Sequence, residues 1–273
     1  MNFRAYIKML RVRNWVGYFL ISVLGYAIFT KLNAGISETL LFYALVCLYL
    51  GFVFSVNNCF DVKEDLLRGK KNNPVATGEI KQKEGMAFSL LLALLGMLLS
   101  LFRGLATFCF FSVLALLSFS YSSPPFRLKS RPFLDLLSHG LFFGALLFLF
   151  PAVFFSTSIE IPHVFLAFSV FYFSVILELR NHMEDYEGDR KAGVRTAVCA
   201  LGISTSEKIT YCLSLLFPLF LLPVFHATSS AVLLPFLITT SIFYPAFCTW
   251  KHYRILDIYS NISYLLIMLG VLL

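Results

Sequence analysis

Charged residues are scarce in this chain of 273 residues. Only 14% are Asp, Glu, Lys or Arg and 59% are hydrophobic, whereas roughly 25% of the residues in soluble proteins are charged. With a mean hydropathy of +0.80, this composition excludes a soluble globular domain. The polar stretches are short, which also excludes a separate soluble domain beside the apolar one.

Paired cysteine motifs are also lacking. The six cysteines lie mostly inside apolar runs, and no two of them are spaced as Cys-x-x-Cys. We therefore expect neither a disulfide framework nor a structural zinc site.

Apolar runs of the length that crosses a bilayer, about 20 residues, fill most of the chain. They predict an all-α, multi-pass membrane protein in which residues 1–273 form a single transmembrane domain. The nine predicted spans are 14–30, 38–58, 85–102, 104–121, 133–155, 161–181, 207–225, 229–249 and 257–273.

Basic side chains lie almost entirely on one side of these predicted spans. With a cytoplasmic N-terminus, 20 of the 22 Lys and Arg residues fall in cytoplasmic segments, and only Lys31 and Arg103 lie outside. The positive-inside rule therefore places the N-terminus and the longer polar loops in the cytoplasm. This asymmetry accounts for most of the net charge of +7, so we expect membrane lipid, and no nucleic acid, around the protein.

Two polar stripes follow apolar runs on the predicted cytoplasmic side. Asn57, Asp61 and Asp65 recur every four residues, and Asp185 and Asp189 repeat that spacing downstream. Residues four apart share one face of a helix, and carboxylates at a membrane are costly unless something compensates them. Two such pairs at helix ends predict a common site for divalent metal and phosphate.

The two stripes are also placed alike within the chain. In both, 124 residues separate the corresponding aspartates, and each stripe follows an even-numbered span. This spacing suggests two pseudo-repeated four-helix halves, about 1–132 and 133–256, followed by a ninth helix.

Oxygen ligands of this kind suit magnesium, which usually binds through one or two carboxylates and substrate phosphates. We predict two Mg²⁺ ions that bridge a diphosphate and neutralise its charge as it leaves. The four aspartates are the catalytic candidates, and Asn57 adds a neutral oxygen to the set of metal ligands.

Basic and polar residues near the stripes are candidates for substrate binding. Arg11 and Asn14, at the edge of the first span, either anchor it at the interface or face the cavity and contact a phosphate. Lys70 lies in a Gly-, Pro- and Asn-containing loop that either covers an anionic substrate or is simply solvated. The fourth span ends at Tyr121 and is followed by two prolines and then by Arg127.

Further titratable residues fall at helical spacing in the second half. Glu178 and His182 share a face with the second stripe. Asp135 and His139, four residues apart in the fifth span, are expected to form a buried hydrogen-bonded couple, with a catalytic role as the alternative.

Aromatic residues are abundant, with 31 phenylalanines and 13 tyrosines. Aromatic faces attract cations within about 6 Å, so a cavity lined by them suits the allylic cation that remains after a diphosphate leaves. Phe60, Tyr121 and Tyr186 lie close enough to the stripes to be members of such a cavity.

At these residues the chain resembles the UbiA superfamily of intramembrane prenyltransferases. Residues 57–65, Asn-Asn-Cys-Phe-Asp-Val-Lys-Glu-Asp, correspond to the family motif Asn-Asp-x-x-Asp-x-x-x-Asp. Residues 182–189, His-Met-Glu-Asp-Tyr-Glu-Gly-Asp, correspond to Asp-x-x-Asp-x-x-x-Asp. The stretches 73–78, 121–129 and 188–196 also resemble family loops. Asn58 and His182 depart from the pattern, because each replaces the first aspartate of its motif.

The resemblance implies about nine helices around a central cavity, a cytoplasmic cap, and two Mg²⁺ ions on a prenyl diphosphate. Carried over by position, Asn57 and the four aspartates become metal or diphosphate ligands. Arg127 and Lys129 become diphosphate contacts, and Tyr121 a cavity wall. We place His182 with the substrate-binding residues.

The predicted function is Mg²⁺-dependent transfer of a prenyl group to a lipophilic acceptor, with a slight preference for an aromatic ring. A glyceryl phosphate acceptor in ether-lipid synthesis is the first alternative. A transporter or lipid-diphosphate binding protein is the alternative of another class, although transporters place their charges nearer the bilayer midplane. A CDP-alcohol phosphotransferase is disfavoured because its Asp-Gly-x-x-Ala-Arg signature is absent. Prenyl length and oligomeric state are left open.

Overall fold

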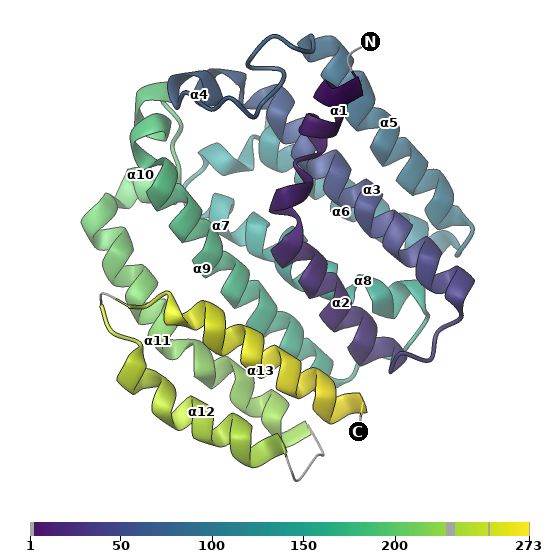
Figure 1. Ribbon diagram of the computed structural model, residues 1–273, viewed down its shortest axis with the longest axis vertical. Coiled ribbons are helices and arrows are strands. Elements are labelled where there is room, and N and C mark those ends of the chain that lie inside the picture. The colour runs from purple at the N-terminus through teal and green to yellow at the C-terminus, as the bar shows by residue number, and fades with distance from the viewer. Residues whose placement is uncertain (1–2, 228–232, 251, 273) are drawn as a thin grey trace.

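The fold is a bundle of long helices, shown in Figure 1 as a computed structural model that describes residues 3–227, 233–250 and 252–272. Within these residues all regular secondary structure is helical. Seven segments are long and apolar enough to cross a membrane, and a bent helix pair makes up to eight. The prediction of an all-α, multi-pass membrane protein is confirmed.

Some of the spanning segments follow one another through short connections, whereas residues 61–81 separate the second from the third. In chain order they are the bent pair containing α2 (Val16–Thr30), α3 (Ile36–Phe60), α5 (Gln82–Leu101), α6 (Leu105–Ser122), the run Leu134–Phe154, α9 (Ile161–Ala192), α11 (Ile203–Ala227) and α13 (Ile255–Leu272). The run Leu134–Phe154 consists of α7 (Leu134–His139), a π-helical turn η3 (Gly140–Ala145) and α8 (Leu146–Phe154).

Shorter helices complete the structure. They are α1 (Phe3–Leu10), η1 (Val12–Asn14), α4 (Val62–Leu67), η2 (Leu128–Ser130), α10 (Ala197–Leu201) and α12 (Leu233–Phe247). Figure 1 shows α1 and α4 together at one end of the bundle, at the top of the view. The acidic ends of α3 and α9 point to this end, so α1 and α4 lie beside the predicted site.

The eighth predicted span, 229–249, is described only in part. Its first residues lie outside the described part of the chain. The described part, α12 (Leu233–Phe247), has 15 residues, fewer than the roughly 20 needed to cross the hydrocarbon core.

The helix of the sixth predicted span, 161–181, continues beyond that span, as the helical spacing of Glu178, His182, Asp185 and Asp189 predicts. The helix α9 continues to Ala192 because the polar side chains of its last turns pair with residues of neighbouring elements instead of meeting lipid. It stops at Gly193, whose φ of 78° is the left-handed conformation that commonly ends a helix.

The first span is preceded by a sharp change of direction. The helices Phe3–Asn14 and Val16–Thr30 meet at 63°, and Arg11 adopts a left-handed φ of 50°. The Trp15 Nε1 donates a hydrogen bond to the Leu10 carbonyl at 2.7 Å. This turn directs the Arg11 side chain toward the end of α3.

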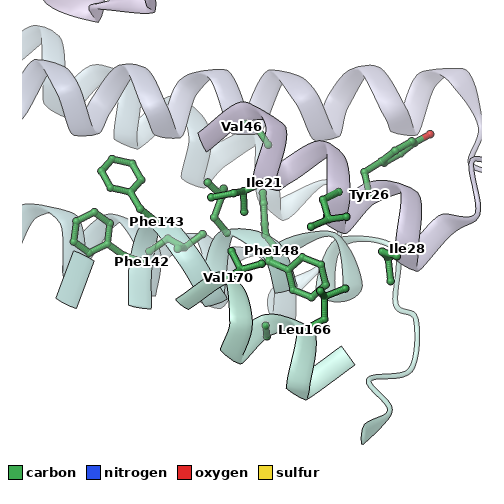
Figure 2. Close-up of a cluster of buried hydrophobic side chains, with 14 of the residues drawn as sticks. Ile21, Tyr26, Ile28, Val46, Phe142, Phe143, Phe148, Leu166 and Val170 are labelled. Atoms are coloured by element: carbon green, nitrogen blue, oxygen red, sulfur yellow. The ribbon is translucent and has the colours of Figure 1, made fainter. Parts of the chain in front are cut away.

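An aromatic-rich core joins α2, α3, η3, α8 and α9. Figure 2 shows Ile21 of α2 and Val46 of α3 in the same cluster as Phe148 of α8 and Val170 of α9. Val46, Phe148 and Val170 are fully buried. This packing fixes α9 relative to α2 and α3, whose ends carry the candidate site residues.

Gly25 is where α2 and α8 approach most closely, and we expect Gly25→Ala to destabilise the fold. An added Cβ would overlap the Phe148 carbonyl oxygen and lie 3.0 Å from Cγ of Pro151. Small residues allow such close helix contacts in membranes, and overpacking costs about 1–3 kcal/mol. Thermal unfolding in detergent should show a lowered Tm. Gly17→Ala on the same helix is the control, because it meets nothing within 4 Å. Equal Tm values for the two variants would contradict the packing described.

Candidate active site

The two acidic stripes lie next to each other because α4 packs against the end of α9. Two basic side chains each contact both stripes. Arg68 Nη1 lies 2.8 Å from Asp185 Oδ2 and 3.8 Å from Asp65 Oδ1. Lys70 Nζ lies 3.3 Å from Asp185 Oδ2 and 3.8 Å from Asp65 Oδ1. Both stripes are therefore within reach of a single ligand.

The first stripe crosses a helix boundary that the sequence did not indicate. The helix α3 ends at Phe60, Asp61 leaves helical geometry with φ −96° and ψ 15°, and α4 begins at Val62. Backbone hydrogen bonds still run from Asp61 to Asn57 at 2.9 Å and from Asp65 to Asp61 at 2.8 Å. The four-residue spacing therefore keeps these three side chains on one face despite the break.

The segment after α6 supplies further cations. Lys129 in η2 is buried and forms an ion pair with Asp61. Arg127 forms an ion pair with Glu64 instead and does not line the cavity described below. Of the two basic residues predicted here, only Lys129 therefore lies where it would meet a ligand shared by the stripes.

A cavity of about 930 Å³ extends from the stripes into the bundle. The four aspartates of the stripes line its polar end, and apolar side chains of α2, α3, α9 and α13 line the rest, among them Leu24, Val53, Phe173, Leu265 and Met268. It lies within the roughly 300–1,000 Å³ usual for ligand pockets. Its shape and chemistry suit a molecule with an anionic head and an apolar tail.

Glu178 is the centre of a buried polar cluster beneath the stripes. It accepts hydrogen bonds from the Tyr121 hydroxyl and from Asn181 Nδ2, the latter at 3.0 Å. His182 Nε2 lies 3.0 Å from Glu178 Oε1, and His139 Nε2 lies 3.3 Å from Oε2. All five side chains line the cavity, so Tyr121 and His182 lie where the sequence placed them.

The prediction that Asp135 and His139 form a hydrogen-bonded couple is wrong. Asp135 accepts from the Ala197 backbone N–H at 2.6 Å and lies 3.3 Å from His182 Nδ1. His139 pairs with Glu178 and with the Ser174 hydroxyl at 3.0 Å. Both residues are buried and each needs a partner, but α9 and α10 supply better placed partners than their own helix does.

The N-terminal segment reaches the site through Arg11. Its Nη1 lies 3.4 Å from Asn57 Oδ1 and 3.5 Å from Asn58 Oδ1, and both Arg11 and Asn14 line the cavity. Asn58 is fully buried and donates to the Met9 carbonyl at 3.0 Å. This departure from the family motif therefore helps attach α1 to α3 and is not a cavity residue.

Two residues of the loop after α4 were not identified from the sequence. Arg68 contacts both stripes, and buried Asn73 donates to Asp65 Oδ2 at 2.9 Å. Arg68 had a weak sequence signal, since a basic residue three positions after Asp65 can reach the same helix face. For Asn73 the only signal in the sequence is that it belongs to the stretch 73–78, which resembles a family loop.

The oxygen atoms at the cavity mouth suit a divalent ion. Asn57 and the four aspartates offer carboxylate and amide oxygens, the ligands that Mg²⁺ prefers. In the described residues, no three acidic, His or Cys side chains are clustered tightly enough to hold a metal alone. Arg68, Lys70 and Lys129 lie between the carboxylates. Because Mg²⁺ typically takes one or two carboxylates plus phosphate oxygens, the residues fit a metal that arrives with a diphosphate.

The membrane bundle and the charged mouth of its apolar cavity are the features expected of an intramembrane enzyme whose substrate is an amphiphilic anion. The sequence pattern that characterises the UbiA prenyltransferase family matches residues 18–263. The chain belongs to this family and is a prenyltransferase, which confirms the resemblance seen in the sequence.

Individual relatives agree with this assignment. The chain is 26% identical over 206 residues to a digeranylgeranylglyceryl phosphate synthase of Sulfurisphaera tokodaii, covering 74% of this chain and 72% of that protein. It is 30% identical over 160 residues to a lycopene elongase/hydratase of Haloarcula japonica, covering 57% of this chain and 51% of that protein.

A solved structure shares the fold. A UbiA homolog from Archaeoglobus fulgidus bound to GPP and Mg²⁺ matches with a TM-score of 0.77 and 22% identity, over 97% of this chain and 98% of that one.

Proposed function

We propose that this prenyltransferase moves a prenyl group from its diphosphate to a lipid acceptor at the cavity mouth. The observation that carries the proposal is the meeting of two acidic stripes at the polar end of an apolar cavity of about 930 Å³. Binding of GPP and Mg²⁺ by a homolog of the same fold supports it.

In this proposal Asn57 and the four aspartates would hold Mg²⁺, with two ions as the expected number. Bound Mg²⁺ supplies neutralisation of the diphosphate charge as the allylic C–O bond breaks. Lys70, Lys129 and Arg11 are placed to donate to the remaining phosphate oxygens. The C–O bond electrons leave with the diphosphate, and the prenyl group becomes an allylic cation.

The cation then meets aromatic faces and the acceptor. Phe143 and Tyr18, which stack at 3.9 Å between ring centroids, line the cavity and present such faces. An acceptor oxygen or carbon forms the new bond to the allylic carbon and loses its proton. Besides the four aspartates, Glu178, Glu184 and Asp257 line the cavity, and we assign the proton to Glu178, which has His139 beside it.

We infer that the acceptor is a glyceryl phosphate lipid. A relative of this chain is a digeranylgeranylglyceryl phosphate synthase. Arg11, Arg68, Lys70 and Lys129 all line the cavity, so an acceptor phosphate would find cationic partners there, whereas an uncharged ring would use none of them. An aromatic acceptor is still the competing prediction.

Purified protein incubated with labelled prenyl diphosphates and a panel of acceptors tests both statements. We expect a prenylated glyceryl phosphate in Mg²⁺, and at least about a 100-fold loss with chelator, because removing transition-state charge stabilisation has effects of this size. Transfer only to a ring would replace the acceptor assignment. Vesicle flux of the lipid diphosphate without turnover would favour a transporter.

Two organisational predictions accompany the proposal. From the distribution of basic residues, we expect the N-terminus and the loops that bear the stripes to face the cytoplasm. The single domain of residues 1–273 would then consist of two related halves, about 1–132 and 133–256, with α13 as an added helix. Labelling of single cysteines in loops of intact cells tests the sidedness.

A further inference from the structure

Arg68 links the two acidic stripes. It follows α4 as its C-terminal cap residue, and its side chain is 14% exposed. Its guanidinium forms ion pairs with Asp185 at 2.8 Å and with Asp189, and it lies 3.8 Å from Asp65. Three of the four carboxylates that would hold a metal therefore share this one side chain.

Gly188 provides the space in which Arg68 lies. A Cβ at Gly188 would overlap Cγ of Arg68 and lie 2.8 Å from its Nε and 3.1 Å from its Cδ. Glycine inside a helix is less favourable than alanine because it loses more backbone entropy on folding. Its presence in α9, directly before Asp189, is explained by the passage of Arg68 across the helix.

In the observed position Arg68 keeps its positive charge, but one of its hydrogen-bond donors has no acceptor. Burial lowers the pKa of the guanidinium, but the carboxylates of Asp189, Asp185 and Asp65 outweigh that effect and raise its pKa. It therefore leaves the carboxylates only by moving, not by losing its proton. Its buried Nε has no hydrogen-bond partner among the described residues, and an unsatisfied buried donor is unfavourable. A second position with a full set of acceptors would compete with this one.

We propose that Arg68 is an exchangeable counter-ion of the metal site. It joins the two stripes while no metal is bound, gives up the carboxylates when metal ions arrive, and then donates to the diphosphate. This inference rests on the proposed function for the identity of the site as one for metal and diphosphate. A static clamp is the alternative role, and it predicts effects of the opposite sign.

The two roles differ in what the loss of Arg68 does to metal binding. An exchangeable counter-ion competes with the metal for the same oxygens, so its removal strengthens binding. A static clamp holds the stripes at the right separation, so its removal weakens binding through repulsion among the carboxylates. Gly188→Ala provides an independent variant, because it displaces Arg68 while all charges stay in place.

The experiment measures binding of Mn²⁺, a divalent ion that also accepts oxygen ligands, to the full chain in detergent without substrate. Free Mn²⁺ is followed by electron paramagnetic resonance. We expect Arg68→Met and Gly188→Ala to bind Mn²⁺ at least tenfold more tightly than the unaltered chain. Lys71→Met is the matched control and should leave the affinity unchanged, because Lys71 is an exposed lysine of the same loop.

Binding of inorganic pyrophosphate tests whether Arg68 donates to a diphosphate after it has left the carboxylates. In saturating Mn²⁺, we expect Arg68→Met to bind pyrophosphate about tenfold more weakly, while Gly188→Ala retains near-normal binding. Unchanged or weaker Mn²⁺ binding in Gly188→Ala overturns the inference, whether or not Arg68→Met folds. If prenyl transfer proves absent while these variants bind Mn²⁺ more tightly, the proposed function fails and the exchange stands. If transfer is normal and the Mn²⁺ affinities are equal, the exchange alone fails.

Discussion

Replacing Asp61 or Asp185 with asparagine is expected to remove nearly all prenyl transfer. Each substitution keeps the shape of the side chain but removes one negative charge from the oxygens proposed to hold Mg²⁺ against the diphosphate. Loss of one preorganised electrostatic contact costs about 10²–10³ in kcat, and we expect at least that loss here. Initial rates with a labelled prenyl diphosphate at saturating Mg²⁺ measure it.

A control on the same helix separates this effect from a general change in surface charge. Glu187→Gln removes a carboxylate from α9 between Asp185 and Asp189, at a side chain that is exposed, and should leave the rate unchanged. Normal transfer by both Asp61→Asn and Asp185→Asn would rule out the assigned site. Loss in only one variant would mean that only its own stripe holds the metal.

Glu178→Gln is expected to separate the two halves of the reaction. Glutamine keeps the size of the side chain and one of its two accepting oxygens but does not accept a proton at neutral pH. General base catalysis contributes about 10²–10⁴ to a rate, so transfer to the acceptor should fall by this range. Ionisation of the diphosphate precedes proton loss, so release of diphosphate through hydrolysis should persist.

The measurement compares product formation with diphosphate release in the same reaction. A transfer rate that falls while release continues supports Glu178 as the proton acceptor. An equal fall of both rates would show instead that Glu178 acts before or during ionisation, or only shapes the cavity. Thermal unfolding of the variant, compared with that of Glu187→Gln, shows whether the buried cluster still packs.

The charge at the mouth of the cavity explains why aspartates are tolerated beside a membrane. Arg68, Lys70 and Lys129 pair with the carboxylates of both stripes, so the net charge near the lipid stays small. In the function that we propose, the same cations turn toward the diphosphate. One set of side chains would then compensate the carboxylates in the free protein and bind the substrate.

The helical periodicity was sufficient to predict some features. Asn57, Asp61 and Asp65 lie on one face even though α3 ends at Phe60, because the backbone hydrogen bonds of both flanking helices continue through the break. The apolar runs likewise predicted most spans, because lipid requires continuous apolar helices whatever their neighbours are. Such local properties do not depend on which helices pack together.

Other features depended on contacts between distant segments. The end of α9 at Ala192 was not readable from hydropathy, because partners from α4 and α13 compensate its polar last turns. Asp135 and His139 have the spacing of a couple, but Ala197 and Glu178 are their partners in the folded chain. Asn58 occupies the position of the first aspartate of the family motif, but its side chain donates a hydrogen bond to the Met9 carbonyl.

By itself, the sequence determined the membrane class, the two carboxylate stripes and the residues that resemble a prenyltransferase family, because these follow from composition and from the period of the α-helix. Only the tertiary structure decided which cations meet the carboxylates, that Arg68 crosses α9 at Gly188, and that Glu178 gathers Tyr121, His139 and His182 beneath them. Apart from Glu178 with His182 and Asp65 with Arg68 and Lys70, these pairings join side chains separated by tens of residues, and packing of the helices is what brings them together.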